Sequence, residues 1–154
     1  GFDPVERARL IETLAPQAVA KGLSLIAYVA ADVPDRVIGD PLRLQQILFN
    51  LLGNAIRYAE PGSRILIRIA PDANSDAAEQ VRVEVQNAGP PIAPQHLARL
   101  FDRFFRVDSA RPDSQAHHGL GLAIVAAIAR MHAGHPLAES DDNGTRVGFT
   151  LAMQ

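Results

Sequence analysis

The stretch that decides the fold is residues 40–58, DPLRLQQILFNLLGNAIRY. Asp followed by Pro is typical of a helix start, because the Asp side chain caps the first turn and Pro fits the position after the cap. Apolar residues then recur with a period of 3.6, at Leu44, Ile47, Leu48, Leu51, Leu52 and Ala55. This pattern predicts an amphipathic helix that buries one face in a core.

A second stripe of the same helix is polar and consists of Arg43, Gln46, Asn50, Asn54 and Arg57. Asn is a poor helix former, and a merely solvated face would normally carry Glu and Lys pairs. Amide oxygens can bind a hard cation such as Mg²⁺, whereas Arg suits an anion. The stripe is therefore either an ordinary exposed face or one wall of a site for an anion with its cation.

The segments around this helix predict an α+β two-layer sandwich, in which three main helices cover one face of a mixed sheet. Besides 40–58, helices are expected at about 3–21 with Gly22 as the stop, at 94–100 and at 119–132. Strands are expected at 23–30, 64–70, 81–87 and 145–153. The polar insert at 71–80 reads as a hairpin loop, and 101–118 has no clear periodicity.

Composition indicates a soluble domain. The 154 residues suit one compact unit, with 47% hydrophobic and 21% charged residues. A net charge of −2 gives no support for binding to nucleic acid or to an anionic membrane. The absence of Cys excludes disulfides and thiolate zinc sites. No apolar run reaches the roughly 20 residues that span a bilayer, and the opening residues do not resemble a signal peptide. A membrane-bound parent protein remains compatible with this composition.

A glycine-containing segment adds a second chemical signal. HHGLGLAIV, residues 117–125, places Gly119 and Gly121 before an apolar helix. Backbone N–H groups at such a helix start form an anion site that suits phosphate. Taken alone, the same segment is better explained by a flexible joint.

Five motifs in succession identify the family that the chain resembles. They are NLLGNAIRY (50–58), VQNAGPPI (85–92), LFDRFFR (100–106), GLGLAIV (119–125) and NGTRVGF (143–149). Their order and spacing resemble the N, G1, F, G2 and G3 boxes of the ATP-binding catalytic domain of bacterial sensor histidine kinases. That domain belongs to the ATPase superfamily shared with gyrase B, Hsp90 and MutL. The resemblance implies a Bergerat-type ATP-binding fold, one domain over residues 1–154 and an ATP lid over residues 101–118.

The resemblance also implies roles for the residues of the first helix. Asn50 would coordinate a Mg²⁺ ion that bridges the triphosphate, and Gln46 would orient a water or a metal ligand; these two are the expected catalytic residues. Asn54 would contact phosphate or ribose. Arg57 would face the phosphates, and Tyr58 would pack beside the adenine.

The remaining nucleotide-binding roles fall on the later motifs. Asn87 would read the adenine amino group, Gly89 would permit close approach of the purine, and Ile92 would form part of the pocket floor. Phe101 and Phe104 would anchor the lid. The residues implied at the phosphates are Arg106, Gly119, Leu120 and Gly121, and Thr145 would support the adenine contact.

Two positions depart from the family pattern. Asn87 stands where the family has Asp, and so loses the charge assistance that makes a hydrogen bond roughly twice as strong. Its amide also carries donors, so we expect weaker discrimination of adenine from guanine than Asp would give. His117 occupies a place often held by Gly. The alternative is therefore a degenerate regulatory domain of a sensor kinase, with weak or no nucleotide binding.

Two subfamilies share parts of the pattern. The segment VQNAGPPIAPQHLARLFDRFFRVDSAR, residues 85–111, resembles heavy-metal sensor kinases, which carry the same Asn. The segment VPDRVIGDPLRLQQILFNLLGNAI, residues 33–56, is more similar to hybrid, multidomain sensor kinases.

The phosphoacceptor of such a kinase is not expected within this sequence. The histidines lie at positions 96, 117, 118, 132 and 135, none in the context of a dimerisation helix. The resemblance implies that the domain binds ATP and Mg²⁺ and donates the γ-phosphate to a histidine on a separate dimerisation domain. A downstream response regulator is the further partner. The domain would be cytoplasmic, without direct membrane contact, and its parent would lie in the bacterial inner membrane.

Overall fold

The computed structural model describes residues 16–31, 40–73, 80–105 and 121–152 of the chain. Residues 16–20 are helical. The elements that follow are β1 (Ser24–Val29), α2 (Pro41–Tyr58), β2 (Arg64–Pro71), β3 (Gln80–Asn87), α3 (Pro94–Leu97), α4 (Gly121–Met131), β4 (Pro136–Asp141) and β5 (Gly144–Ala152). None of the helices within these ranges is both long and apolar enough to cross a membrane.

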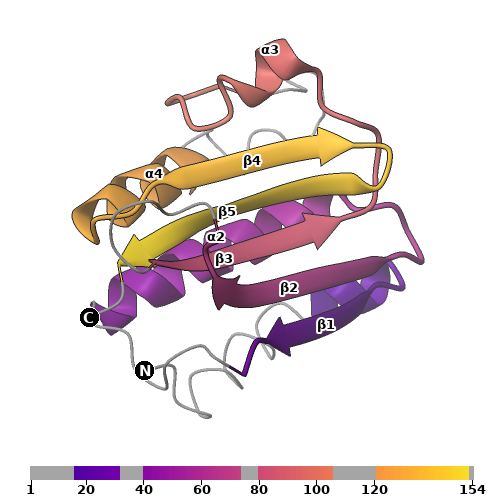
Figure 1. Cartoon of the computed structure of the whole chain (residues 1–154). Coiled ribbons are helices and arrows are strands. Elements are labelled where there is room, and N and C mark those ends of the chain that lie inside the picture. The colour runs from indigo at the N-terminus through magenta and orange to yellow at the C-terminus, as the bar shows by residue number, and fades with distance from the viewer. Residues whose placement is uncertain (1–15, 32–39, 74–79, 106–120, 153–154) are drawn as a thin grey trace.

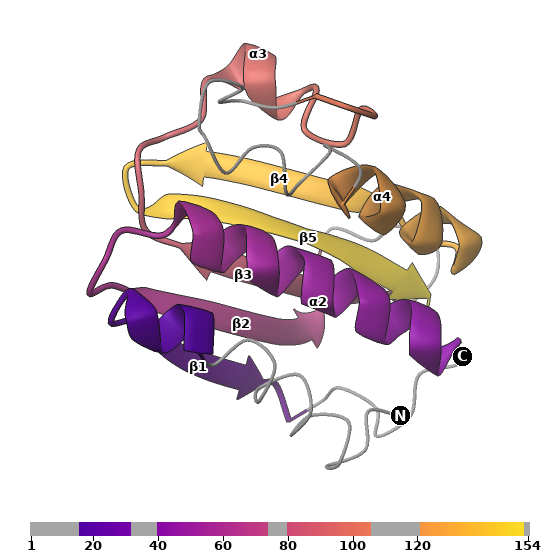
Figure 2. The same cartoon turned by 180° about the vertical axis from the view of Figure 1, so that it is seen from behind.

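One five-stranded sheet carries the fold, with the strand order β1-β2-β3-β5-β4. β1 runs parallel to β2, and the other neighbouring pairs are antiparallel. The segment 16–20, α2 and α4 lie together on one face of this sheet (Figures 1 and 2). The predicted α+β sandwich, with a mixed sheet covered on one face by helices, is confirmed.

Helix α2 forms as its sequence predicts. The Asp40 carboxylate accepts hydrogen bonds from the backbone N–H groups of Leu42 and Arg43, at 3.0 and 3.4 Å. The helix ends at Tyr58, and its inner face is buried against the sheet through Ile47, Leu51, Leu52, Ala55 and Ile56. The apolar stripe therefore holds the polar stripe in a fixed direction, beside α4 and away from the sheet.

Alternation along the strands separates the two faces of the sheet. On β3, Val81, Val83 and Val85 are buried in the core beneath the helices, whereas Arg82 and Glu84 are half-buried on the uncovered face. The core is completed by residues of α4 and β5, namely Val125, Ile128, Ala129, Val147, Phe149 and Leu151.

Several element boundaries differ from those predicted. β4 was not predicted, because its sequence PLAESD begins with Pro and is half polar, as suits an edge strand that pairs on one side only. The predicted helix at 94–100 is a helix only over Pro94–Leu97. Gly22, expected to end the first helix, has φ of +66°, the left-handed conformation typical of that role. Residues 3–15 of that predicted helix lie outside the described residues.

Candidate nucleotide-binding site

The middle of α2 meets the start of α4 at Asn50. The Asn50 Nδ2 group donates to the backbone carbonyl oxygen of Gly121 at 3.3 Å. A Cβ added to Gly121 would lie 3.9 Å from Asn50 Cγ, so the two segments are in van der Waals reach. The N-box asparagine and the glycine segment, distant in sequence, are thus brought together. With Nδ2 engaged, Oδ1 is the atom of Asn50 left to accept a hydrogen bond or bind a cation.

The side-chain oxygen of Asn50, Oδ1, is chemically suited to bind Mg²⁺. Mg²⁺ binds oxygen ligands, keeps several waters, and is held in many sites by one or two protein groups together with substrate phosphates. An amide oxygen on a fixed helix face, next to the N-terminus of α4, meets this requirement. Gln46 lies one turn earlier on the same stripe and is exposed, and Asn54 lies one turn later and is half-buried.

The C-terminal end of α2 meets the loop after β3. A Cβ added to Gly89 would lie 3.1 Å from the Tyr58 carbonyl oxygen and 3.6 Å from Asn87 Nδ2. The Glu60 N–H donates to the Ala88 carbonyl at 3.0 Å. Glycine at position 89 therefore lets the loop approach the helix end closely. Tyr58, Asn87 and Gly89 form one group in the structure.

Asn87 occupies the last position of β3, where it is 6% exposed. It pairs with Ile65 of β2 and with Thr145 of β5. Its Nδ2 group donates to the Ala88 carbonyl at 3.3 Å. In this orientation the carbonyl oxygen of the side chain is the acceptor left for a ligand, as the Asp of the family pattern would provide.

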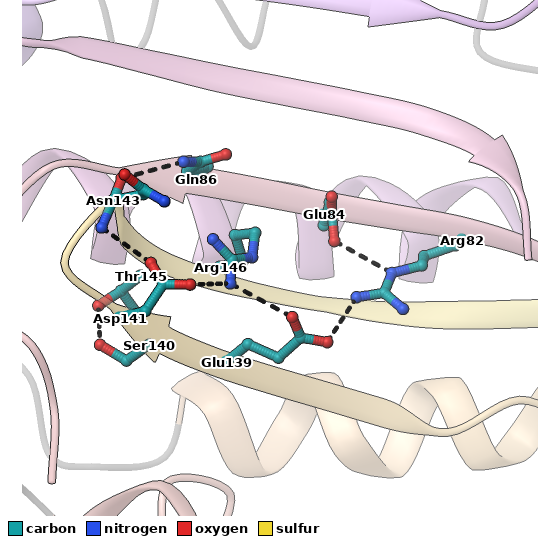
Figure 3. Close-up of polar contacts among 9 residues, drawn as sticks. All are labelled: Arg82, Glu84, Gln86, Glu139, Ser140, Asp141, Asn143, Thr145 and Arg146. Atoms are coloured by element: carbon teal, nitrogen blue, oxygen red, sulfur yellow. Dashed lines mark hydrogen bonds and ion pairs between the residues drawn. The ribbon is translucent and has the colours of Figure 1, made fainter. Parts of the chain in front are cut away.

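A chain of hydrogen bonds connects Ile92 to Thr145 through Ser140. The Ile92 N–H donates to Ser140 Oγ at 2.8 Å, and Ser140 Oγ lies 2.9 Å from Thr145 Oγ1. Thr145 is 6% exposed, and Ser140 is its cross-strand neighbour (Figure 3). Ser140 was missed by the sequence analysis because β4 was missed. A strand there would have placed it opposite Thr145.

Gly144 was quoted within a motif but not assigned a role. Its φ is +122°, and a Cβ at this position would lie 2.4 Å from the Asn87 carbonyl oxygen. Only glycine fits such a conformation and such a contact. The start of β5 therefore packs directly against Asn87, the residue expected to bind the adenine amino group.

On the uncovered face of the sheet, charged side chains of β3, β4 and β5 are joined by ion pairs (Figure 3). Glu139 accepts from Arg82 Nη2 at 3.1 Å and from Arg146 Nη2 at 3.3 Å. Arg146 Nη2 also donates to Asp141 at 2.9 Å. The hydrogen bond from Arg82 lowers the pKa of Glu139, and the one from Arg146 lowers the pKa of Asp141.

The turn between β4 and β5 is tied to β3 as well. The Asn143 N–H donates to Asp141 Oδ1 at 2.9 Å, and the Asn143 carbonyl accepts from Gln86 Nε2 at 3.1 Å (Figure 3). Together with the ion pairs, these hydrogen bonds fix the turn that places Gly144 and Thr145 next to Asn87.

The other predicted site residues are placed as follows. The Arg57 guanidinium carbon lies 5.6 Å from the centre of the Tyr58 ring, and both side chains are half-buried. Phe101 packs against the core. Phe104 is 69% exposed and has φ of +66°. Arg106, Gly119 and Leu120 lie outside the described residues, as does the predicted lid beyond residue 105.

A separate hollow of about 200 Å³ lies on the uncovered face, near the β2–β3 hairpin. It is lined by Arg68, Ala70, Pro71, Asp72, Ala73, Arg82 and Glu84. Pro71 pairs with Val81, at the opposite end of β3 from Asn87. This hollow shares no residue with the predicted nucleotide site.

Comparison with known proteins agrees with this geometry. A family model described as histidine kinase-, DNA gyrase B-, and HSP90-like ATPase matches residues 39–154. Over 116 residues, 75% of this chain, the sequence is 47% identical to the sensor histidine kinase CusS of Escherichia coli (strain K12). Over the same length it is 41% identical to the signal transduction histidine-protein kinase BarA of the same strain. The chain spans only 23% of CusS and 12% of BarA.

A solved structure extends the comparison to the fold. Full-length ShkA in complex with AMPPNP superposes with a TM-score of 0.76 at 27% identity, over 99% of this chain and 31% of that one. The Bergerat-type fold predicted from the motifs is confirmed.

Proposed function

Because this chain belongs to the family of histidine kinase-, DNA gyrase B- and HSP90-like ATPases, we propose that it is the catalytic domain of a sensor histidine kinase. It binds Mg²⁺–ATP and donates the γ-phosphate to a histidine on a separate dimerisation domain. The observation that carries this proposal is the hydrogen bond from Asn50 to Gly121, which joins the amide stripe of α2 to the glycine-led start of α4. The AMPPNP complex of ShkA supports the nucleotide class.

The base is proposed to bind at the C-terminal end of α2. Tyr58, Asn87 and Gly89, which lie together there, would line that place with Ile92 and Thr145. The Asn87 oxygen would accept from the adenine amino group, with Thr145 held beside it by Ser140.

The phosphates are proposed to extend along α2 from this end toward Asn50. Asn50 and Tyr58 are eight residues apart, about 12 Å along a helix axis. Asn54 and Arg57 lie between them on the same stripe and would contact the ribose and the phosphates. Gly121, with Gly119, Leu120 and Arg106, completes the phosphate end. The proposal also includes a lid over residues 101–118, which Phe101 and Phe104 would anchor.

Asn50 would hold the Mg²⁺ ion through Oδ1, and the bound ion would neutralise phosphate charge during transfer. Asn50 and Gln46 would fix the terminal phosphate and its water or metal ligand in position. A histidine nitrogen from the partner domain would attack the γ-phosphorus in line, forming the N–P bond while the bond to the β,γ-bridging oxygen breaks and ADP leaves. Catalysis of this kind comes mostly from positioning and electrostatics.

The described histidines support an external phosphoacceptor, since each has a structural partner. His132 accepts from the Asp40 N–H at 3.1 Å through Nε2, and its Nδ1 lies 2.8 Å from the Ile128 carbonyl. His135 Nδ1 lies 3.2 Å from Thr150 Oγ1. The His96 ring packs against Phe105 at 5.8 Å.

The second candidate is a degenerate regulatory domain, which the Asn at position 87 favours. In that case the Asn87→Asp substitution would create nucleotide binding where the wild type has little. If the pocket is active, the same substitution would instead improve discrimination of ADP over GDP by about fivefold to tenfold, the worth of one hydrogen bond.

The parent protein is proposed to work in two-component signalling. CusS and BarA are named as sensor and signal transduction kinases, which supports a dimerisation domain and a response regulator as partners. The domain would then face the cytoplasm of a bacterium whose inner membrane holds the parent.

A phosphotransfer assay tests the proposal. The chain is incubated with ATP labelled in the γ-phosphate and with a dimerisation domain from a related kinase, either intact or with its histidine replaced. We expect label on the intact dimerisation domain alone, and its loss in Asn50→Ala. Gln80→Ala, which removes an amide at the far end of β3, serves as the matched control. Label on a histidine of this chain, or ATP binding without any transfer, would contradict the proposal.

A further inference from the structure

Lys21, the only lysine of the chain, contacts the end of α2 from outside that helix. It lies in the turn between the helical segment 16–20 and β1. Its Nζ group donates to the carbonyl oxygens of Ile56, Arg57 and Ala59, at 2.9, 2.7 and 3.2 Å. An ammonium group has three donors, which matches three carbonyl acceptors.

These carbonyls lie where a helix lacks partners of its own. The last four carbonyl groups of a helix have no N–H partner within it, and together they carry the negative end of the helix dipole. In α2, the Ala55 carbonyl is bound by the Ala59 N–H at 2.9 Å. Lys21 binds the next two, at Ile56 and Arg57, and thus supplies the charge and the donors that the helix end requires.

The carbonyl that lies between those bound by Lys21 belongs to Tyr58, and it faces the candidate site. Its oxygen lies 3.1 Å from the position of a Cβ on Gly89. Two residues later, the Glu60 N–H donates to the Ala88 carbonyl at 3.0 Å. The short segment 56–60 is therefore held by Lys21 on one side and contacts the loop after Asn87 on the other.

The backbone around Lys21 is docked on the same region. The Lys21 carbonyl accepts from the Gly62 N–H at 2.8 Å. Gly22 has φ of +66°, and a Cβ there would lie 3.8 Å from the Gly62 Cα. The Lys21 side chain thus starts from a backbone that is itself docked on the loop at Gly62.

We propose that Lys21 is a positioning residue for the base end of the nucleotide site. It holds the end of α2 so that Tyr58 and Glu60 keep their contacts with the Ala88–Gly89 backbone, and so keep the loop after Asn87 in place. The inference rests on the proposed nucleotide binding and goes beyond it, because Lys21 binds backbone carbonyls at the end of α2 and is assigned no contact with the nucleotide. The phosphate end at Asn50 lies about two turns away along α2.

The test compares ADP binding by calorimetry with amide hydrogen exchange at residues 58–60 and 87–89. Lys21→Met removes the charge and the donors, Lys21→Gln keeps one polar head, and Lys21→Arg restores both charge and donors. Asp40→Ala is the matched control, because it removes the cap at the opposite end of the same helix.

We expect Lys21→Met to weaken ADP binding by roughly fivefold or more, the worth of about one hydrogen bond, and to speed exchange at both segments. The affinity of Lys21→Gln for ADP should lie between those of Lys21→Met and the wild type. Lys21→Arg and Asp40→Ala should both bind ADP as the wild type does. If Lys21→Met does not fold, Lys21→Gln and Lys21→Arg carry the comparison.

Unchanged affinity in Lys21→Met, or an equal loss in Asp40→Ala, would overturn the inference, since the effect would then be absent or merely one of stability. A wild type that binds no ADP would overturn the proposed function itself. Fast exchange at 58–60 without fast exchange at 87–89 would show that the helix end is held by Lys21 but does not position the loop, which also overturns it.

Discussion

Replacing Ser140 with alanine tests the hydrogen-bond chain that supports Thr145. The substitution removes an oxygen that accepts from the Ile92 N–H at 2.8 Å and lies 2.9 Å from Thr145 Oγ1. Each of the two hydrogen bonds contributes about 0.5–1.5 kcal/mol net, so the free energy of unfolding should fall by about 1–3 kcal/mol. Because Ile92 is only half-buried and water can reach its N–H in part, we expect about 1–2 kcal/mol.

The assay is urea unfolding of Ser140→Ala, Thr145→Val and the double variant. A direct bond between the two hydroxyls predicts a coupling of about 0.5–1.5 kcal/mol, because each single variant already breaks it. Ser63→Ala is the matched control, since its hydroxyl contacts the Glu60 carbonyl at 2.5 Å in an exposed turn; we expect a change below about 0.5 kcal/mol. Strict additivity of the two substitutions, or a Ser140→Ala effect no larger than the control, would refute the reasoning.

Two further substitutions test the geometry around this end of the sheet. Gly144→Ala should destabilise the fold by more than about 2 kcal/mol in urea unfolding, because its Cβ would lie 2.4 Å from the Asn87 carbonyl at φ of +122°. Glu139→Gln should lower stability at neutral pH by at most about 1 kcal/mol, since this carboxylate is largely exposed. The hydrogen bond from Arg82 lowers the pKa of Glu139 below 4.5, so its contribution is present above that pH and is lost as the pH falls through the lowered pKa.

The two substitutions, Gly144→Ala and Glu139→Gln, each have their own control. Gly62→Ala also places alanine at a positive φ, +79°, but a Cβ there meets nothing within 4 Å. It should cost about 1 kcal/mol of backbone strain alone, and an equal cost at Gly144 would argue against the contact with Asn87. For Glu139→Gln, added salt should shrink the difference from wild type. A difference that persists after the pH has fallen well below the lowered pKa of Glu139 would exclude the charge as its cause.

Local signals made α2 predictable from the sequence. The Asp40 cap, the Pro after it and the apolar period all act within a few residues, and the structure reproduces each of them. The meeting of Asn87 with Thr145 was implied only by the family resemblance, and the β3–β5 register brings the two together as neighbours.

Contacts without a local pattern could not be predicted. β4 is an edge strand whose residues alternate weakly, so its pairing with β5 and the role of Ser140 were missed together. The contact from Lys21 to the end of α2 joins residues 35 to 38 positions apart through backbone acceptors, which every residue carries. No residue type marks such an acceptor in the sequence, and only the folded chain reveals it.

Nucleotide titration with and without Mg²⁺ tests the central claim most directly. Calorimetry of the wild type should show ATP binding in the micromolar to millimolar range that strengthens with Mg²⁺, because we propose that Asn50 Oδ1 binds the ion. Asn50→Ala should lose this dependence while Gln80→Ala keeps it. Equal Mg²⁺ dependence in the wild type and in Asn50→Ala, or a wild type that binds no ATP, would contradict the account.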